Sequence, residues 1–316
     1  MHPLLKEGVL YFLLFIDELM LHFKQITISD KEKIDTCLQG NDYRVCDFCF
    51  TNLFAWQSKF KTLFSIVEET LFLCFEDDDC QQCYFMPVGK MSLEKSFSLI
   101  KEDAEKKGIP FQMKGVSEKM WKQIQEVMSD KLRYKDDRNN AEYLYLSEKL
   151  ISLRGKKLQS KRNHINQFKT KHSDWQYVSI QTKEDCAECL SMLEVWEAEN
   201  NPNDEWALRY DFIATKTMLD NFHYLQLRGG MIRANGKIVA FTIGEPLTSD
   251  TFCVHVEKAF SEINGAYAII NQQFIEHEAS NFTYINREED MGLENLRKAK
   301  KSYYPDILLQ EGVVKL

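Results

Sequence analysis

Residues 286–305 read NREEDMGLENLRKAKKSYYP, and the fold of the chain can be worked out from this segment. It follows an apolar run at 282–285 that predicts a strand, turns at Gly292, and continues into a short helix that Pro305 ends. The predicted helix carries four cations, Arg297, Lys298, Lys300 and Lys301. A strand end that supplies carboxylates beside a cationic helix can hold a charged ligand, and it can equally be a solvated surface.

The preceding residues predict a mixed α/β layer structure. Two helices at 184–198 and 211–222 are followed by strands at 225–227, 230–234, 237–244 and 251–256, then by a helix at 266–278. Asn235 and Gly236 form the strongest short hairpin signal in the chain. A ligand site is expected at the strand-to-helix junction after Val256.

The first half predicts a second α/β set. Apolar runs at 63–67, 71–75 and 83–87 indicate antiparallel strands, followed by a helix that ends at Gly108 and another that Ser117 caps. The length of 316 residues allows two domains. We expect an extension or helix at 1–23, a first domain at 24–178, and a second at 179–316 that carries the active site.

A cationic stretch occupies residues 154–171, RGKKLQSKRNHINQFKTK, in a chain whose net charge is −8. As a helix it presents a narrow apolar stripe of Leu158, Ile165 and Phe168 and a broad cationic face. That concentration of charge favours an anionic partner, such as phosphate, a tRNA end or a lipid headgroup. The alternative is a solvated helix face.

Nine cysteines without a secretory signal point to a reducing cytoplasm. Three Cys-x-x-Cys pairs, 46/49, 80/83 and 186/189, raise the idea of a zinc ribbon. Because the first pair runs into an aromatic stretch without a glycine knuckle, ordinary thiols are favoured, and we expect no metal. The apolar run Val9–Ile16 is too short to span a bilayer, so no transmembrane segment is predicted. Met20 is an alternative start to Met1.

The chain resembles the phosphatidylglycerol lysyltransferase C-terminal domain family, whose soluble bacterial members were long a domain of unknown function. Four places carry the resemblance: FTNLFAW at 50–56; GKK at 155–157 with KRNHINQF at 161–168; HVEKA at 255–259 with NGAY at 264–267; and residues 286–305. The resemblance implies two tandem GNAT-like domains, as in Fem-type aminoacyltransferases, each with a mixed, mostly antiparallel sheet flanked by helices. It also implies transfer of an aminoacyl group from aminoacyl-tRNA to an amine or hydroxyl acceptor.

The sequence departs from the family in two places. Lipid-modifying members carry a large membrane domain that this chain lacks, which favours a soluble or peripheral acceptor over one buried in a bilayer. GNAT enzymes bind the acyl-CoA pyrophosphate at a Gln/Arg-x-x-Gly-x-Gly/Ala turn. Here Glu262 and Tyr267 stand where a cation or amide and a small residue are expected, so acyl-CoA is the second choice of donor. A third hypothesis is a non-catalytic module that binds RNA or anionic lipid through 156–171.

Charge suggests the site residues. We predict that Arg297 and Lys300 stabilise the oxyanion and that Asp290 and Glu257 orient or deprotonate the acceptor. The alternatives are a helix N-cap for Asp290 and a surface pair with Lys258 for Glu257. The predicted donor and phosphate contacts are Lys157, Lys161, Arg162, Asn163, Gly265 and Lys301. His164 and His255 are expected to have hydrogen-bonded structural roles.

Overall fold

The computed structural model describes residues 20–128, 132–201 and 205–316. The predicted N-terminal extension with its apolar run lies almost wholly outside the described residues. The chain forms two compact units. Unit 1 contains the described residues up to Asn41, with Gln57–Arg138 and Gln310–Leu316, and unit 2 contains Asp42–Trp56 and Asn139–Leu309. In the described ranges, no helix combines the length and the apolar character that crossing a membrane requires.

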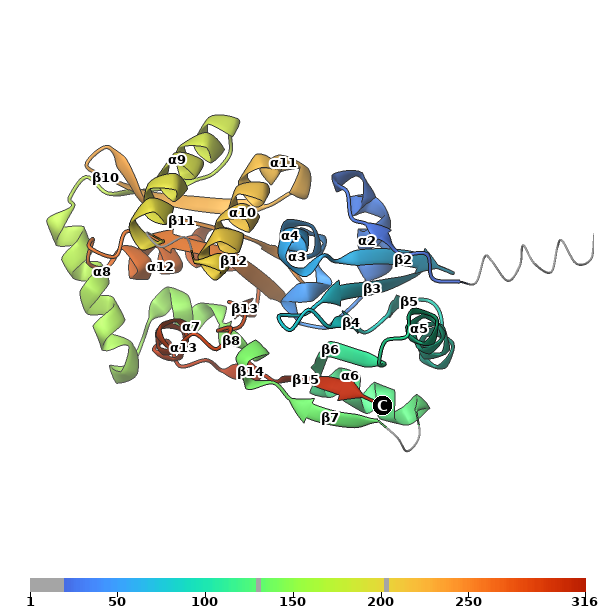
Figure 1. Cartoon of the computed structure of the whole chain (residues 1–316). Coiled ribbons are helices and arrows are strands. Elements are labelled where there is room, and N and C mark those ends of the chain that lie inside the picture. The colour runs from blue at the N-terminus through green and yellow to red at the C-terminus, as the bar shows by residue number, and fades with distance from the viewer. Residues whose placement is uncertain (1–19, 129–131, 202–204) are drawn as a thin grey trace, which may run out of the picture. The chain divides into compact units, whose positions relative to one another are not determined.

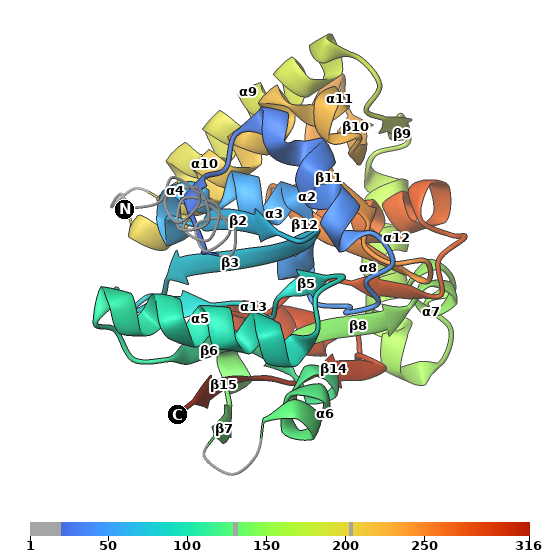
Figure 2. The ribbon, with the colours of Figure 1, turned by 90° about the vertical axis from the view of Figure 1, so that its right-hand side faces the viewer.

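Unit 1 is built on sheet A, across which α5 runs in Figure 2. The strands follow the order β1 (Lys24–Gln25), β2 (Leu63–Val67), β3 (Thr70–Glu76), β4 (Gln82–Tyr84), β6 (Gln112–Ser117), β15 (Glu311–Lys315) and β7 (Arg133–Asp136), and β5 (Val88–Gly89) pairs with β3. The described helices are η1 (Ile28–Asp30), α2 (Lys31–Leu38), α4 (Gln57–Phe60), α5 (Leu93–Lys107) and α6 (Glu118–Val127).

The predicted helix signals in unit 1 are confirmed. Ser117 caps α6 by accepting a hydrogen bond from the Met120 amide. Gly108 ends α5 with φ of 66°, a left-handed conformation that glycine adopts at little cost. Phe97 and Ile100 on α5 are buried, as the apolar spacing indicates. Local sequence therefore determines where these helices begin and end.

Unit 2 is built on sheet B (Figure 1). The strand order is β14 (Ile307–Leu309), β8 (Glu142–Leu146), β13 (Tyr284–Asn286), β12 (Thr251–Ala259), β11 (Lys237–Pro246), β10 (Arg228–Ala234) and β9 (Gln176–Ser179). The described helices are η2 (Cys46–Phe48), α3 (Phe50–Ala55), α7 (Ser147–Ser152), η4 (Lys156–Leu158), α8 (Gln159–Lys171), α9 (Lys183–Asn200), α10 (Trp206–Asp220), α11 (Phe222–Leu225), α12 (Ala266–Glu278) and α13 (Glu294–Lys301).

The pairing in sheet B is antiparallel except between β12 and β13, which are parallel. Asn235 and Gly236, with φ of 53° and 72°, form the β10–β11 turn, so the predicted hairpin is confirmed. The predicted fold class, two α/β units with mixed, mostly antiparallel sheets and flanking helices, is confirmed.

The division into units differs from the predicted boundary between residues 178 and 179. Residues 139–178 belong to unit 2, because β8 pairs with β13 and β14 and β9 pairs with β10. The last strand, β15, returns to unit 1 and pairs with β6 and β7. Both units are therefore assembled from segments far apart in the sequence.

A β-bulge in β12 changes which face of sheet B each following side chain lies on. Ile243 pairs with Val256 and Gly244 with Val254, so His255 is the extra residue. Val254 packs into the core with α7, α8 and α12, and Glu257 also meets α12, through Asn271. Lys258 instead reaches Asp211 on α10, and α9 packs on the same face (Figure 1).

Gly265 allows α12 to begin directly against α8. Its φ is 90°, and a Cβ at this position would lie 2.4 Å from the His164 carbonyl oxygen. The neighbouring Asn264 is hydrogen-bonded to His164 at 2.8 Å and to Gln167 at 2.7 Å. Helix α8 therefore covers the turn at the start of α12.

This close approach predicts that Gly265→Ala destabilises the protein more than Gly236→Ala. Both glycines have positive φ, but a Cβ at Gly236 would meet nothing within 4 Å. We expect Gly265→Ala to lower the free energy of unfolding by about 1–3 kcal/mol more than the control, the usual cost of forcing an extra carbon into a packed contact. Urea-induced unfolding of both variants measures the difference, and equal losses would contradict the packing described.

Candidate functional site

Strands β12 and β13 separate after three parallel pairs, of which the last joins Cys253 and Asn286. Beyond that pair, contacts between side chains, rather than backbone hydrogen bonds, connect β12 with the segment that follows β13. His255 contacts Glu288 on the face covered by α9 and α10, and Glu257 contacts Arg287 on the face covered by α12. Two groups of polar side chains therefore lie on opposite faces of sheet B within unit 2.

The first group, the Arg287 cluster, consists of Glu257, Asn271, Arg287, Tyr303 and Lys161. Glu257 accepts one hydrogen bond from Arg287 Nη2 and one from Asn271 Nδ2, both at 2.9 Å. The guanidinium carbon lies 4.9 Å from the Tyr303 ring centroid. Among the described residues, Arg287 Nη1 and Asn271 Oδ1 have no hydrogen-bond partner, although both are shielded from solvent. The cluster thus holds one spare donor and one spare acceptor.

Lys161 completes this cluster from α8. Its ammonium lies 4.1 Å from the Tyr303 ring centroid and forms no hydrogen bond or ion pair with another described residue. Burial, aided by the charge of Arg287, lowers the pKa of Lys161 against the opposing effect of Glu257. A lysine in such a setting loses its proton more readily than a solvated one.

The second group, the His255 cluster, contains His255, Glu245, Glu288, Cys49 and Cys253. His255 Nδ1 lies 2.8 Å from Glu288 Oε1, and Nε2 lies 3.1 Å from Glu245 Oε1. Burial alone would lower the pKa of His255, but Cys253, Cys49 and Glu245 outweigh it and raise the pKa well above its usual range. Burial would likewise raise the pKa of Glu245 and Glu288, and His255 outweighs it and lowers both. The group is a charged carboxylate–imidazolium–carboxylate bridge, which matches the structural role expected for His255.

Metal-ligating side chains gather in three sets, Cys49/Glu245/His255, Cys253/His255/Glu288 and Cys46/Glu142/Glu289. The ligand atoms of each set lie within 4.8 Å of one another. Tetrahedral zinc, with bonds of about 2.0–2.3 Å, separates its ligand atoms by more than 3 Å. The 2.8 Å contact between His255 and Glu288 is therefore a hydrogen-bond distance. Over the described ranges, no such set includes Cys80 or Cys83, which lie in unit 1.

Asp290 and Arg297, both predicted to be catalytic, are bound to each other. Asp290 is fully buried and accepts from Arg297 Nε at 2.8 Å and Nη2 at 2.6 Å, from the Tyr143 hydroxyl, and from the Gly292 amide at 3.0 Å. The N-cap of α13 is Leu293, so Asp290 does not hold the N-cap position considered as its alternative. The pair fixes the turn that leads into α13.

Lys300, the third predicted catalytic residue of this segment, is buried, and its ammonium donates to the carbonyl oxygens of Arg287 and Glu289. Burial lowers the pKa of Lys300, against the opposing charges of Glu289 and Glu288. Lys301, the adjacent predicted donor contact, is exposed. Lys300 therefore holds the backbone segment that carries Arg287 in place.

The predicted donor contacts on α8 do not gather at one point. Lys157 lies 5.2 Å from the Tyr304 ring centroid, and Asn163 is exposed. Arg162 donates to the carbonyl oxygens of Leu153 and Gly155, which follow α7. Gly265 packs against α8. Of the predicted residues, Glu257 and Lys161 meet at the Arg287 cluster.

Asn271, Arg287 and Tyr303 are the members of this cluster that sequence reasoning missed. Arg287 lies within residues 286–305 but outside the predicted helix, whose four cations gave the stronger charge pattern. Asn271 lies one residue after the isoleucines of α12 and carries no signal of its own, because its partner Glu257 is 14 residues away.

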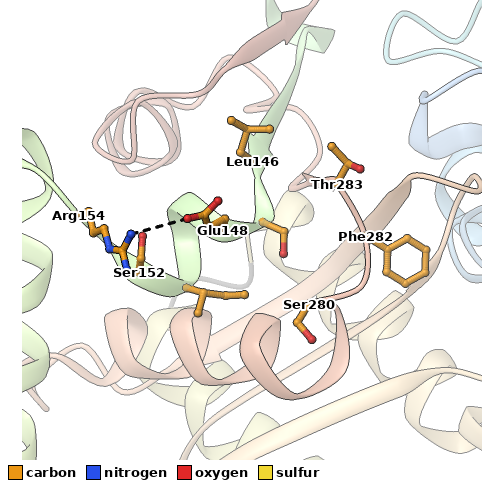
Figure 3. A pocket seen from close by; sticks show the side chains of 9 residues that line it. Leu146, Glu148, Ser152, Arg154, Ser280, Phe282 and Thr283 are labelled. Carbon is orange, nitrogen blue, oxygen red and sulfur yellow. Dashed lines mark ion pairs between the residues drawn. The ribbon is translucent and has the colours of Figure 1, made fainter.

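A separate pocket of about 470 Å³ lies in unit 2 (Figure 3). Its lining comes from the end of β8, from α7 and from residues 280–283. The charged side chains in it, Glu148 and Arg154, are 3.9 Å apart and more than 80% exposed. It contains none of the predicted site residues and has little to orient a reacting group.

Glu142 is a buried carboxyl behind the end of β13. It accepts from the Cys46 amide at 2.8 Å and from the Asn286 side chain. Burial, together with the charge of Glu289, raises the pKa of Glu142 to about 7. This carboxyl therefore binds its proton more tightly in the folded protein than in the unfolded chain.

A family model matches most of this chain. The family described as "Phosphatidylglycerol lysyltransferase, C-terminal" matches residues 41–311. A solved structure of a conserved protein of unknown function from Bacteroides thetaiotaomicron is 39% identical with a TM-score of 0.88, covering 94% of this chain and 100% of that chain.

More distant matches extend the comparison. The C-terminal domain of a protein described as a lysylphosphatidylglycerol synthetase from Agrobacterium fabrum is 12% identical with a TM-score of 0.62, over 92% of each chain, which shows the fold alone. An uncharacterised protein of Mycoplasmoides gallisepticum is 22% identical over 180 residues, 56% of this chain and 57% of that protein. The chain thus aligns with little more than half the length of this relative.

The raised pKa of Glu142 predicts a pH-dependent stability. A carboxyl that binds its proton more tightly when folded stabilises the protein fully below its unfolded pKa of about 4.3, and this contribution is lost as pH rises towards its folded pKa. We expect the unfolding free energy of the wild type, relative to Glu142→Gln, to fall between about pH 4.3 and 7 and to level off above that range. Urea unfolding at a series of pH values measures this difference, and a difference that grows with pH would contradict the assignment.

Proposed function

Because this chain belongs to the phosphatidylglycerol lysyltransferase C-terminal family, we propose that unit 2 transfers an aminoacyl group from aminoacyl-tRNA to an amine or hydroxyl acceptor. The observation that carries the proposal is the spare guanidinium nitrogen of Arg287, shielded from solvent beside Lys161 at the point where β12 and β13 separate. A fixed cation in a dry site is well suited to a reaction that develops negative charge on oxygen.

The proposed reaction is direct attack without a covalent enzyme intermediate. The acceptor nitrogen or oxygen bonds to the ester carbonyl carbon, and the carbonyl oxygen becomes an oxyanion. The bond between that carbon and the ribose oxygen then breaks, and the proton lost by the acceptor ends on the ribose hydroxyl. Arg287 Nη1 is placed to stabilise the oxyanion, since its other terminal nitrogen is held by Glu257.

Lys161 and Glu257 have different parts in this scheme. Both oxygens of Glu257 already accept hydrogen bonds, so we assign it to orienting Arg287 rather than to taking a proton. The lowered pKa of Lys161 makes this side chain the better proton carrier between acceptor and ribose. The catalytic roles predicted for Asp290, Arg297 and Lys300 remain predictions, and their contacts point to support of the segment that carries Arg287.

Two features support aminoacyl-tRNA over acyl-CoA as the donor. The turn where GNAT enzymes hold the acyl-CoA pyrophosphate is here covered by α8, through Gly265 and Asn264. The short helix η4, directly before α8, also presents exposed cations, Lys156 and Lys157, a few residues before the lysine of the cluster. Exposed lysines beside a reactive site suit a polyanionic donor.

The proposal predicts a specific loss in Lys161→Met. With total tRNA charged with labelled amino acids and hydroxylamine as a small amine acceptor, we expect the wild type to form aminoacyl hydroxamates faster than the enzyme-free reaction does. We expect no such acceleration with acetyl-CoA. Loss of the proton carrier should lower the rate by about 10²-fold or more. The matched control is Lys169→Met, a lysine on the same helix 4.8 Å from the Trp175 ring centroid, which should leave the rate unchanged within about twofold.

Equal rates for the wild type and Lys161→Met would remove Lys161 from the mechanism. Absence of any turnover, with tRNA still bound, would favour instead the hypothesis of a non-catalytic RNA-binding module.

Charge reversal in η4, directly before α8, provides a second test. Lys156→Glu combined with Lys157→Glu should weaken the binding of tRNA and reduce the slope of log K against log salt by about 1–2, because each phosphate contact contributes about 0.7–0.9. Filter binding between about 50 and 200 mM salt measures the slope. Lys216→Glu on α10, whose ammonium pairs with Asp220, is the control. An unchanged slope in the double variant would place the tRNA elsewhere.

A further inference from the structure

The Arg287 cluster has spare hydrogen-bonding atoms of opposite kinds. Among the described residues, Arg287 Nη1 is a donor without an acceptor, and Asn271 Oδ1 is an acceptor without a donor. The two groups are held by the same carboxylate, that of Glu257. Asn271 is 2% exposed and the Arg287 side chain 10%, so bulk water does not serve them.

Such atoms are costly to leave unsatisfied. More than about 90% of buried polar groups in proteins find a partner, and each one that does not destabilises the protein. A ligand that supplies the missing partners removes this destabilisation. The cluster suits a ligand with an acceptor oxygen for Arg287 and a donor for Asn271. A cationic donor is favoured, because Arg287 and Asn271 both donate to the Glu257 carboxylate.

An α-amino acyl group has this pattern. Its carbonyl or carboxyl oxygen and its ammonium nitrogen are attached to adjacent carbons. A plain acyl group would satisfy Arg287 and leave Asn271 unpaired, and a phosphate would do the same while facing the charge of Glu257. Arg287, Asn271 and Glu257 together therefore favour the α-ammonium nitrogen and the carbonyl or carboxyl oxygen of an amino acid.

We propose that Glu257, Asn271 and Arg287 form a subsite for the α-amino acyl group, in which Asn271 Oδ1 and Glu257 bind the ammonium and Arg287 Nη1 binds the acyl oxygen. The assignment of this group to the aminoacyl end of a tRNA rests on the proposed function. The recognition itself rests on the contacts above and applies equally to a free amino acid.

Lys161 lies beside the subsite. Its ammonium and the guanidinium carbon of Arg287 lie 4.1 Å and 4.9 Å from the centroid of the same buried ring, that of Tyr303. Lys161 has no ion pair or hydrogen bond to another described residue, so its flexible side chain can change rotamer at low cost. In the proposal, this side chain moves aside when a ligand enters.

Binding of stable analogues to the wild-type protein tests the subsite directly. The probes are 3′-aminoacylamino-3′-deoxyadenosine, its α-hydroxy and α-deamino counterparts, and free alanine, measured by calorimetry. We expect the α-amino nucleoside to bind at least about tenfold more tightly than the α-deamino counterpart, which leaves the buried Asn271 acceptor unpaired. It should also bind more tightly than the α-hydroxy counterpart, whose neutral hydroxyl can donate to Asn271 but brings no positive charge to Glu257. Equal affinities for the three nucleosides overturn the subsite.

Asn271→Leu keeps the size of the side chain and removes the acceptor. It should reduce the preference for the α-amino nucleoside, because Glu257 alone then faces the ammonium, whereas Asn295→Leu, at an exposed position on α13, should leave the preference unchanged. An undiminished preference in a folded Asn271→Leu protein assigns the amine to other residues and overturns the proposal. If Asn271→Leu does not fold, the comparison of analogues on the wild type still decides.

The outcomes separate this inference from the proposed function. Discrimination among the nucleosides without transfer from charged tRNA supports the subsite and contradicts the transferase. Transfer without discrimination supports the transferase and overturns the subsite. Binding of free alanine but of no nucleoside supports the subsite and identifies its source as a free amino acid.

Discussion

The hydrogen bonds from the buried Lys300 ammonium to the carbonyl oxygens of Arg287 and Glu289 hold the segment on which unit 2 depends. Beyond Asn286 the segment has left the ladder with β12, and Glu288 adopts a φ of 57°. A buried cation between two carbonyls replaces the missing strand bonds and sends Arg287 and Glu288 to opposite faces of the sheet. The Asp290–Arg297 pair then fixes the following turn. The cations of α13 are used to build the site rather than to face its ligand.

The two polar clusters differ in where an unpaired buried atom lies. In the His255 cluster, both ring nitrogens face carboxylates, so the charged group itself is paired. Asn52, which donates to Glu288, keeps a buried oxygen without a partner among the described residues, as Asn271 does in the Arg287 cluster. Only in the Arg287 cluster, among the described residues of the two, does the cation also keep a buried nitrogen without a partner. The spare donor on Arg287, rather than burial or an unpaired amide oxygen, therefore distinguishes this cluster.

The parts of the fold that could be predicted from the sequence are those that depend on neighbouring residues alone. The Asn235–Gly236 hairpin and the caps at Ser117 and Gly108 follow from conformational preferences of single residues, and the segment 286–305 led to the correct family. The assignment of distant segments to one unit could not be predicted in this way. It depends on long-range pairing, such as that of β15 with β6 and β7, and no local signal marks it. The site was harder still. Period-2 alternation places His255 and Glu257 on one face, and only the bulge at His255, set by pairing with β11, sends them to opposite faces.

One packing event accounts for both the donor preference and the proton carrier in the proposed mechanism. Helix α8 reaches the start of α12 only because position 265 is a glycine, and in doing so it covers the turn that would otherwise receive a pyrophosphate. The same placement lays Lys161 over Tyr303, where burial lowers its pKa. Moving α8 away to admit acyl-CoA would withdraw Lys161 from the cluster. In the proposed mechanism, the covered turn and the partly buried lysine therefore follow from one placement of α8.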